Sequence, residues 1–343
     1  MPVYSANDAR FHVQWLEPEQ PDRNRVDLER QKTGLADGAG AAGRTPLVVF
    51  VHGLVMDNLS SFYYTLAGPV MSAGARVLLY DLRGHGRSER TLRGYSTSAG
   101  AADLIALLAA SGVTEPAYLV SNSFGGLIAA QAALAAPDRI AGLALIEACC
   151  AGAPAAAWLE DMVNTLSAGA LSLEYHQTAA ALLAAGQRKL GRMAITAQAL
   201  LNETDLIEEL AAERPLDATE LGRISCPVLA VYGDQSDLLG GADDLRRHVA
   251  DCDIKLIPGL AHTVLRDATG TLRAVLLDWL SRHGAAPAFH PADDSAVSAS
   301  AVNASAVNAS AVSTAASAAV PAAALAAEDV FPEVPAPREE AGR

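Results

Sequence analysis

Short apolar runs rich in Val, Leu and Ile recur along the chain, and longer segments with helical spacing of apolar residues separate them. Such runs are typical of strands that are buried on both faces of a sheet. The predicted strands are Leu47–Val51, Val77–Tyr80, Ala117–Val120, Leu143–Ile146, Val228–Tyr232 and Ile254–Ile257. The predicted helices are Ala101–Ala110, Phe124–Ala135, Leu245–Ala250 and Leu272–Leu280. This alternation predicts an α/β fold, with a mostly parallel central sheet flanked by helices.

The segment ahead of these strands predicts the edge of the sheet. Phe11–Leu16 alternates enough to form a first edge strand, and the polar stretch Glu17–Arg44 leaves room for one more.

One gap interrupts the alternation, since about eighty residues separate the strand ending at Ile146 from the strand starting at Val228. This gap is too long for a plain crossover connection. It contains three helical patterns, Ala155–Leu166, Tyr175–Leu190 and Ala197–Ala212. We therefore expect a core domain made of residues 1–147 and 223–284, with residues 148–222 inserted as a helical lid.

The last part of the chain has a different composition. From Ser295 a five-residue repeat of Ser, Ala, Val and Asn matches neither strand nor helix periodicity, and a stretch rich in Pro, Glu and Ala follows it. Because no face of such a segment can be buried, residues 285–343 are predicted to be a low-complexity, disordered tail.

Charge and composition narrow the classes of partner. The chain has 25 Lys and Arg against 39 Asp and Glu, and this net charge of −14 disfavours binding to nucleic acid. The first thirty residues contain several charges and no long apolar stretch, so we expect neither a secretory signal nor a membrane segment, and a cytoplasmic location. The four cysteines lack metal or redox spacing, and no dinucleotide or phosphate-binding motif is present. No cofactor and no metal are therefore expected.

The clearest chemical motif is Ser121-Asn122-Ser123-Phe124-Gly125-Gly126, which joins a predicted strand to a predicted helix. A tight turn between strand and helix would expose the Ser123 hydroxyl, and small neighbours would let the helix pack close to the strand. The motif resembles the G-x-S-x-G nucleophile elbow of the α/β-hydrolase family, except that Ser121 stands in place of the first glycine.

Two further segments share this resemblance. After His52-Gly53, the backbone N–H of Leu54 corresponds to one oxyanion donor of the family, and the N–H of Phe124 corresponds to the other. The segment from Asp81 to Ser88 resembles the family's D-x-R-G-x-G-x-S turn. We expect His52, Asp81, Arg83 and His85 to brace loops and not to take part in catalysis.

The resemblance also implies a base and an acid. His262 lies in a Gly-containing loop after the last predicted strand, where the family has its catalytic histidine. Two acids follow the strand Val228–Tyr232, and the resemblance favours Asp237 over Asp234 as the partner of that histidine. Glu147, at the end of the strand before the lid, is a third choice. The order Ser123, Asp237, His262 along the chain is that of an α/β-hydrolase.

These residues predict acyl transfer through an acyl-enzyme intermediate. The leading hypothesis is an esterase or thioesterase for a small to medium hydrophobic acyl group, with Trp158, Met162 and Tyr175 of the lid as candidate substrate-binding residues. The partner is then a small-molecule ester or thioester, with neither nucleic acid nor membrane.

Three alternatives stay open. The motif around Ser123 also resembles that of hydrolases that cleave carbon–carbon bonds of ring-fission products, and the same triad serves cofactor-free haloperoxidases or perhydrolases. A non-catalytic binding module of the same fold is the alternative from a different class.

Overall fold

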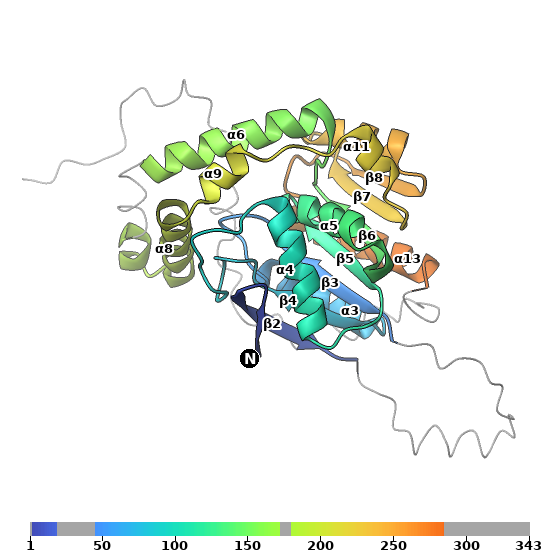
Figure 1. Ribbon diagram of the computed structural model, residues 1–343, viewed down its shortest axis with the longest axis horizontal. Helices are drawn as coiled ribbons and strands as arrows, with labels where there is room; N and C mark the ends of the chain where they lie inside the picture. Colours follow the sequence, from blue (N-terminus) through green and yellow to red (C-terminus); the bar gives the residue numbers. More distant parts are fainter. Residues whose placement is uncertain (1, 19–44, 172–179, 285–343) are drawn as a thin grey trace, which may run out of the picture.

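An eight-stranded sheet runs through the middle of the molecule, in the order β1-β2-β4-β3-β5-β6-β7-β8 (Figure 1). The structure is a computed structural model that describes residues 2–18, 45–171 and 180–284. β1 and β2 pair antiparallel with their neighbours, and the strands from β4 to β8 pair parallel. The strands are β1 (Val3–Ala6), β2 (Ala9–Leu16), β3 (Leu47–Val51), β4 (Arg76–Tyr80), β5 (Ala117–Asn122), β6 (Ile140–Ile146), β7 (Val228–Gly233) and β8 (Cys252–Ile257).

Helices cover both faces of this sheet. On one face, α4 (Thr97–Ala110), α5 (Phe124–Ala135) and α11 (Leu239–His248) bury their apolar side chains in one core cluster. On the other face lie α2 (Ser60–Phe62), the π-helix η1 (Tyr63–Ala67), α3 (Gly68–Ser72), α12 (Val264–Asp267) and α13 (Thr269–Arg282). The short 3-10 helix η2 (Pro137–Arg139) leads into β6. Because both faces are covered, central strands such as β3 and β7 are buried along their whole length, as the continuous apolar runs predicted.

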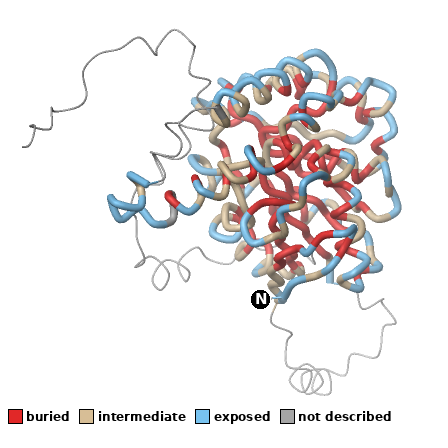
Figure 2. The backbone as a smooth tube through the Cα atoms, turned by 60° about the vertical axis from the view of Figure 1, so that its left-hand side comes forward, coloured by how far each residue is buried: buried red, intermediate tan, exposed pale blue. Residues whose placement is uncertain are grey.

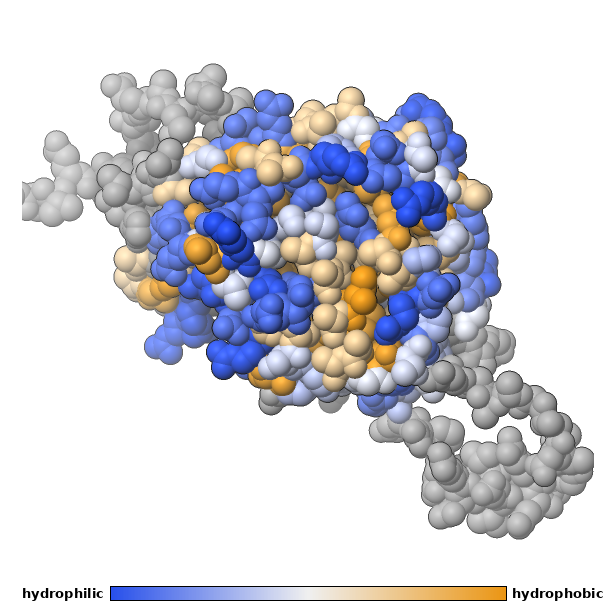
Figure 3. Space-filling model, in the orientation of Figure 1, coloured by the Kyte–Doolittle hydropathy of each residue, from blue (hydrophilic) through white to orange (hydrophobic). Residues whose placement is uncertain are grey.

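The exposed surface reflects this layering. Figure 2 shows the buried residues gathered around the sheet and the exposed residues on the outer turns of the helices. In Figure 3, hydrophobic residues gather in a patch that extends from the middle to the lower edge of the visible face, with hydrophilic residues on either side. No helix within residues 2–18, 45–171 and 180–284 is long and apolar enough to cross a membrane.

The segment between β6 and β7 is helical where it is described. It contains α6 (Gly152–Leu171), α8 (Arg188–Glu203), α9 (Leu206–Ala211) and α10 (Ala218–Gly222). α6 packs against α8, α9 and α11, and it lies across the top of the view in Figure 1. Its role as a lid stays a prediction. The predicted tail, residues 285–343, lies outside the described residues.

The structure differs from the sequence-based prediction in the extent of two helices and in the place of one edge strand. The predicted helix 197–212 is two helices, because Thr204 adopts an extended conformation between α8 and α9. The helix predicted to end at Ala250 already ends at His248, where Val249 turns extended toward β8. The additional edge strand is β1, which precedes β2 along the chain, whereas residues 19–44 lie outside the described residues.

Candidate active site

Ser123 occupies a strained turn between β5 and α5. Its backbone has φ 52° and ψ −124°, a conformation that is costly for any residue except glycine. A side chain at Gly125 would come within 2.4 Å of the Val51 carbonyl oxygen, and one at Gly126 would come within 2.3 Å of the Ala148 Cβ. These contacts explain why the turn needs glycine after Ser123. Ser121 replaces the first glycine of the motif without a clash, since its buried hydroxyl donates to the Ala144 carbonyl oxygen at 3.2 Å.

The loop after β8 brings His262 to this serine. The distance from His262 Nε2 to Ser123 Oγ is 3.2 Å, within hydrogen-bonding reach of a nucleophile and its base. Both residues are half-buried, and the His262 side chain keeps 21% of its surface exposed. The structure thus brings together the two residues that sequence reasoning paired across 139 positions.

The acid beside His262 is Glu147, and the preference for Asp237 was wrong in this respect. Glu147 Oε2 lies 3.2 Å from His262 Nδ1, and the Glu147 side chain is 1% exposed. Its carboxylate also accepts hydrogen bonds from the Gly233 N–H and the Ser236 hydroxyl, each at 2.5 Å. Glu147 itself has φ 50°, so the chain turns sharply where β6 ends. These bonds hold the carboxylate in one orientation against the imidazole.

The turn after β7 explains why neither aspartate takes this place. Ser236 donates its N–H to the Gly233 carbonyl oxygen, and this tight turn directs Ser236 inward while Asp234 and Asp237 are exposed. Asp234 instead accepts a hydrogen bond from the Gly259 N–H at 2.7 Å, which fixes the loop that carries His262. The signal for Glu147 in the sequence was an acid that follows directly on the apolar run Leu143–Ile146 and precedes Ala148, Cys149 and Cys150. An acid in such surroundings is buried, and a buried carboxylate needs a partner.

The loop after β3 places Leu54 beside the serine turn. Gly53 lies next to Asn122, and the Gly53 N–H donates to the Asp57 carboxylate at 2.8 Å. Within the described residues, neither the Leu54 N–H nor the Phe124 N–H donates to an internal acceptor. Two such donors at the serine turn form the arrangement expected of an oxyanion hole, whose function here stays a proposal.

Two buried histidines fix this loop as neutral groups. His52 bridges the Gly53 carbonyl oxygen and the Leu82 N–H, and His85 bridges the Arg83 carbonyl oxygen and the Val55 N–H. In each ring Nε2 accepts a hydrogen bond, so Nδ1 carries the proton. Both histidines therefore brace loops, as the sequence predicted.

The burial of His85 makes the stability of the folded protein depend on pH. Burial, together with the nearby His52, lowers the pKa of His85 from its ordinary value of 6.5 to about 3. The unfolded chain therefore takes up a proton below pH 6.5 that the folded protein refuses, and stability present above that pH is lost as the pH falls toward 3. Between pH 7 and pH 5 this loss amounts to about 2 kcal/mol. Denaturant unfolding of wild type and His85→Gln at both pH values should show a smaller pH dependence in the variant by about that amount; equal pH dependence would contradict it.

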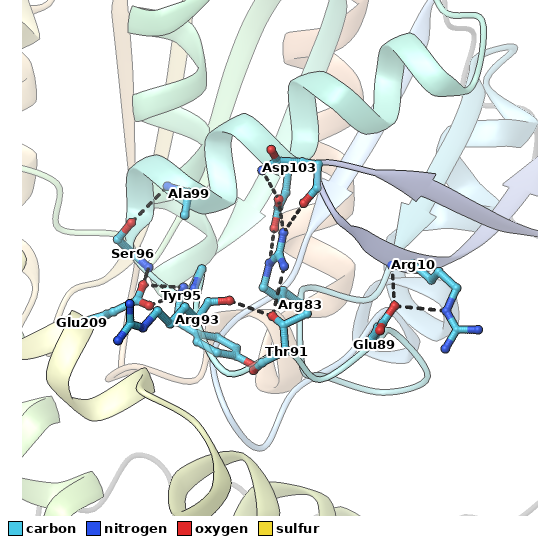
Figure 4. A network of polar contacts seen from close by, with 12 residues as sticks. Arg10, Arg83, Glu89, Thr91, Arg93, Tyr95, Ser96, Ala99, Asp103 and Glu209 are labelled. Carbon is cyan, nitrogen blue, oxygen red and sulfur yellow. Dashed lines mark hydrogen bonds and ion pairs between the residues drawn. The ribbon is translucent and has the colours of Figure 1, made fainter.

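The inserted segment is fastened to the core by carboxylates of α9 and its following turn. Glu209 accepts hydrogen bonds from the backbone N–H groups of Gly94, Tyr95 and Ser96 at 2.7 to 2.9 Å (Figure 4). Glu213 accepts two more from the N–H and the hydroxyl of Thr97, the first residue of α4. Carboxylates suit this position because the N-terminus of a helix presents unpaired N–H groups.

Removing one of these carboxylates should weaken the whole fold. Glu209→Ala leaves three backbone N–H groups without their acceptor, and we expect the free energy of unfolding to fall by about 2 kcal/mol. The exposed neighbour Glu208 provides the control, since Glu208→Ala removes a carboxylate from the same helix with little expected effect. Urea denaturation of both variants measures the difference, and equal stability would show that the Glu209 bonds contribute little.

The predicted substrate-binding residues have different surroundings. Trp158 and Met162 of α6 are half-buried and pack against the core cluster that includes α4 and α5. Tyr175 lies outside the described residues. Within the described part of the chain, no group of three or more His, Cys, Asp or Glu side chains could hold a metal ion.

Comparisons with known proteins agree with the observed fold. A family model described as alpha/beta hydrolase fold matches residues 46–170. Carbamate hydrolase RutD of Variovorax paradoxus is 39% identical over 94 residues, which cover 27% of this chain and 35% of that protein. The non-heme chloroperoxidase of Streptomyces lividans is 28% identical over 262 residues, covering 67% of this chain and 90% of that protein.

Solved structures extend the likeness in fold beyond the matched segment. The enol-lactonase from Burkholderia xenovorans LB400 superposes with a TM-score of 0.58 at 20% identity, over 82% of this chain and all of that one. The matched segment and the solved structures together show that the chain has the α/β-hydrolase fold.

Proposed function

We propose that the protein is a serine hydrolase that cleaves a carboxylic ester or thioester of a small to medium hydrophobic acyl group. The observation that carries this proposal is the continuous contact from Ser123 Oγ to His262 Nε2 and from His262 Nδ1 to Glu147, each at 3.2 Å. A serine hydroxyl is a weak nucleophile at neutral pH and needs a base within reach. The imidazole meets this need, and the buried carboxylate holds its tautomer.

The reaction then proceeds in two halves. His262 takes the Ser123 proton as Oγ attacks the carbonyl carbon, and the negative charge on the substrate oxygen is stabilised by the N–H groups of Leu54 and Phe124. The imidazolium returns the proton to the leaving alcohol or thiol, which leaves an acyl group on Ser123. Water enters, His262 removes its proton, and the second tetrahedral intermediate collapses to the free acid and Ser123. Glu147 stabilises the charged imidazolium in both halves.

An active-site probe tests the enzyme against a non-catalytic module of the same fold. We expect a fluorophosphonate to label the protein once, and mass spectrometry to place the adduct on the peptide that contains Ser123. Hydrolysis of p-nitrophenyl esters and of acyl-thioesters by the same sample would then give the acyl preference. Absence of both labelling and turnover would overturn the proposal.

A second candidate function has one observation in its favour. The likeness to a non-heme chloroperoxidase extends over 67% of this chain, and the same catalytic groups could pass the acyl group to hydrogen peroxide instead of water. The product would then be a peracid, which oxidises halide. Monochlorodimedone halogenation with acetate, peroxide and bromide would detect this activity.

A further inference from the structure

A small pocket lies beside the proposed reaction centre, between the sheet and the first turns of α4 and α5. Its empty space is about 320 Å³ with its open mouth included. Leu54 and Phe124 form part of its wall, so the pocket lies next to the two proposed oxyanion donors. Gly94, Tyr95 and Ser96, which the Glu209 carboxylate holds, form another part. Core residues therefore line the pocket, and the inserted segment holds part of its wall through Glu209.

One polar group in this wall has no partner. Tyr80, the last residue of β4, lines the pocket and is fully buried, and its hydroxyl finds no hydrogen-bond partner within the described residues. An unpaired buried hydroxyl costs about 1 to 3 kcal/mol. Burial and the negative charge of Asp103 raise the pKa of Tyr80, so its hydroxyl stays protonated and able to donate. Tyr95 lines the same pocket, but its hydroxyl already donates to the Thr91 carbonyl oxygen at 2.6 Å.

The charged groups at this pocket neutralise one another. Arg83 and Asp103 form two hydrogen bonds at 2.6 and 2.8 Å, and Asn7 donates to the same carboxylate at 2.6 Å. Arg83 also donates to the Asn7 carbonyl oxygen and to the Thr91 hydroxyl, as the dashed lines around it in Figure 4 illustrate. Because this ion pair is internally satisfied, the pocket offers a ligand neither a free cation nor a free anion.

We propose that this pocket is a substrate subsite that accepts a short apolar branch bearing one uncharged oxygen, which receives a hydrogen bond from Tyr80. The inference rests on the proposed function and narrows its substrate class to esters or thioesters with an ether, keto or hydroxyl oxygen in a short side branch. A carboxylate in that position would meet Asp103 without a free cation to compensate. A purely hydrocarbon branch would fit, but it would leave the Tyr80 hydroxyl unpaired.

Isosteric substrates test this subsite. In each of a series of p-nitrophenyl esters, one methylene of a straight acyl chain is replaced by an ether oxygen, as in methoxyacetate against butanoate and its longer homologues. The ether ester and the alkyl ester differ in intrinsic reactivity, but this difference is the same for both enzymes. It therefore cancels when the ether-to-alkyl ratio of kcat/KM is compared between wild type and Tyr80→Phe. For the chain length that reaches Tyr80, we expect this ratio to fall about three- to tenfold in the variant. Tyr118→Phe removes a hydroxyl that donates to the His283 carbonyl oxygen away from the pocket, so it is the matched control and should leave the ratio unchanged.

Thermal stability provides a second measurement. Tyr80→Phe should have the same melting temperature as wild type or a higher one, because it removes an unpaired hydroxyl, whereas Tyr95→Phe should melt lower. The subsite is overturned if the ratio is unchanged at every chain length, or if Tyr80→Phe loses as much stability as Tyr95→Phe.

Binding separates this inference from the proposed function. The simple amides of the same acids should raise the melting temperature more for the ether than for the alkyl member, and only when Tyr80 is present. If wild type hydrolyses no ester but shows this preference, the proposed function fails and the subsite stands. If esters are hydrolysed and no preference depends on Tyr80, only the subsite fails.

Discussion

We expect Glu147→Gln to lower kcat by about four orders of magnitude while the protein stays folded. The carboxylate accepts from His262 Nδ1 at 3.2 Å, and this contact selects the tautomer in which Nε2 can accept the Ser123 proton. The amide of glutamine has nearly the same shape but can present an N–H to the ring, which would stabilise the opposite tautomer. It also removes the negative charge that stabilises the imidazolium. Steady-state kinetics on a p-nitrophenyl ester measure the loss.

The matched control for this substitution is Asp237→Asn. Asp237 is exposed, and the His262 Nδ1 position that it would need is taken by Glu147. Its substitution should therefore change kcat by less than about twofold. A large loss in Asp237→Asn together with a small loss in Glu147→Gln would assign the acid to the turn after β7 and refute the assignment made from the structure.

Ser123→Ala should cause the largest loss, about 10⁶-fold in kcat, because no acyl-enzyme can form without the hydroxyl. The alanine keeps the backbone turn, in which φ is 52°, so stability should change by little more than the loss of the hydroxyl contact. Any residual rate would come from the N–H groups of Leu54 and Phe124 acting on a direct attack by water. Turnover close to that of wild type would exclude Ser123 as the nucleophile.

The double variant shows whether the two residues act as one unit. If Glu147 works only through His262 and Ser123, then adding Glu147→Gln to Ser123→Ala should lower kcat little further. Additive losses of the two single variants would instead indicate that Glu147 acts on the substrate by a separate route.

Local patterns predicted most of the fold and two of the three residues in the contact that joins Ser123, His262 and Glu147. The apolar runs marked the strands because both faces of the sheet are covered, and the glycines after Ser123 marked a turn that tolerates no larger side chain. The position of His262 followed from its loop after the last strand. Each of these features depends on residues that are close together in the sequence, so one amino-acid sequence is enough to predict it.

The acid could not be found in the same way. Glu147 and the turn after β7 both lie at the carboxyl ends of neighbouring strands, and both can reach the space beside His262. What decides between them is the turn from Gly233 to Ser236, which directs the serine inward and Asp237 outward. The conformation of that turn depends on tertiary packing, because Gly233 packs against the Leu260 carbonyl oxygen in the loop that carries His262. The unpaired hydroxyl of Tyr80 likewise depends on packing between elements far apart in the chain.

The hydrogen bonds from the start of α4 to Glu209 and Glu213 also limit where a segment of this protein can be exchanged for that of a relative. A foreign segment could be grafted between β6 and β7 to test whether this segment sets the proposed acyl preference, but Glu209 and Glu213 accept hydrogen bonds from the start of a core helix. A chimera that replaces them would lose part of the core together with the segment. The junction should therefore lie at Thr204, where α8 ends in an extended residue, so that α9 and the turn after it stay with the native start of α4 that they bind.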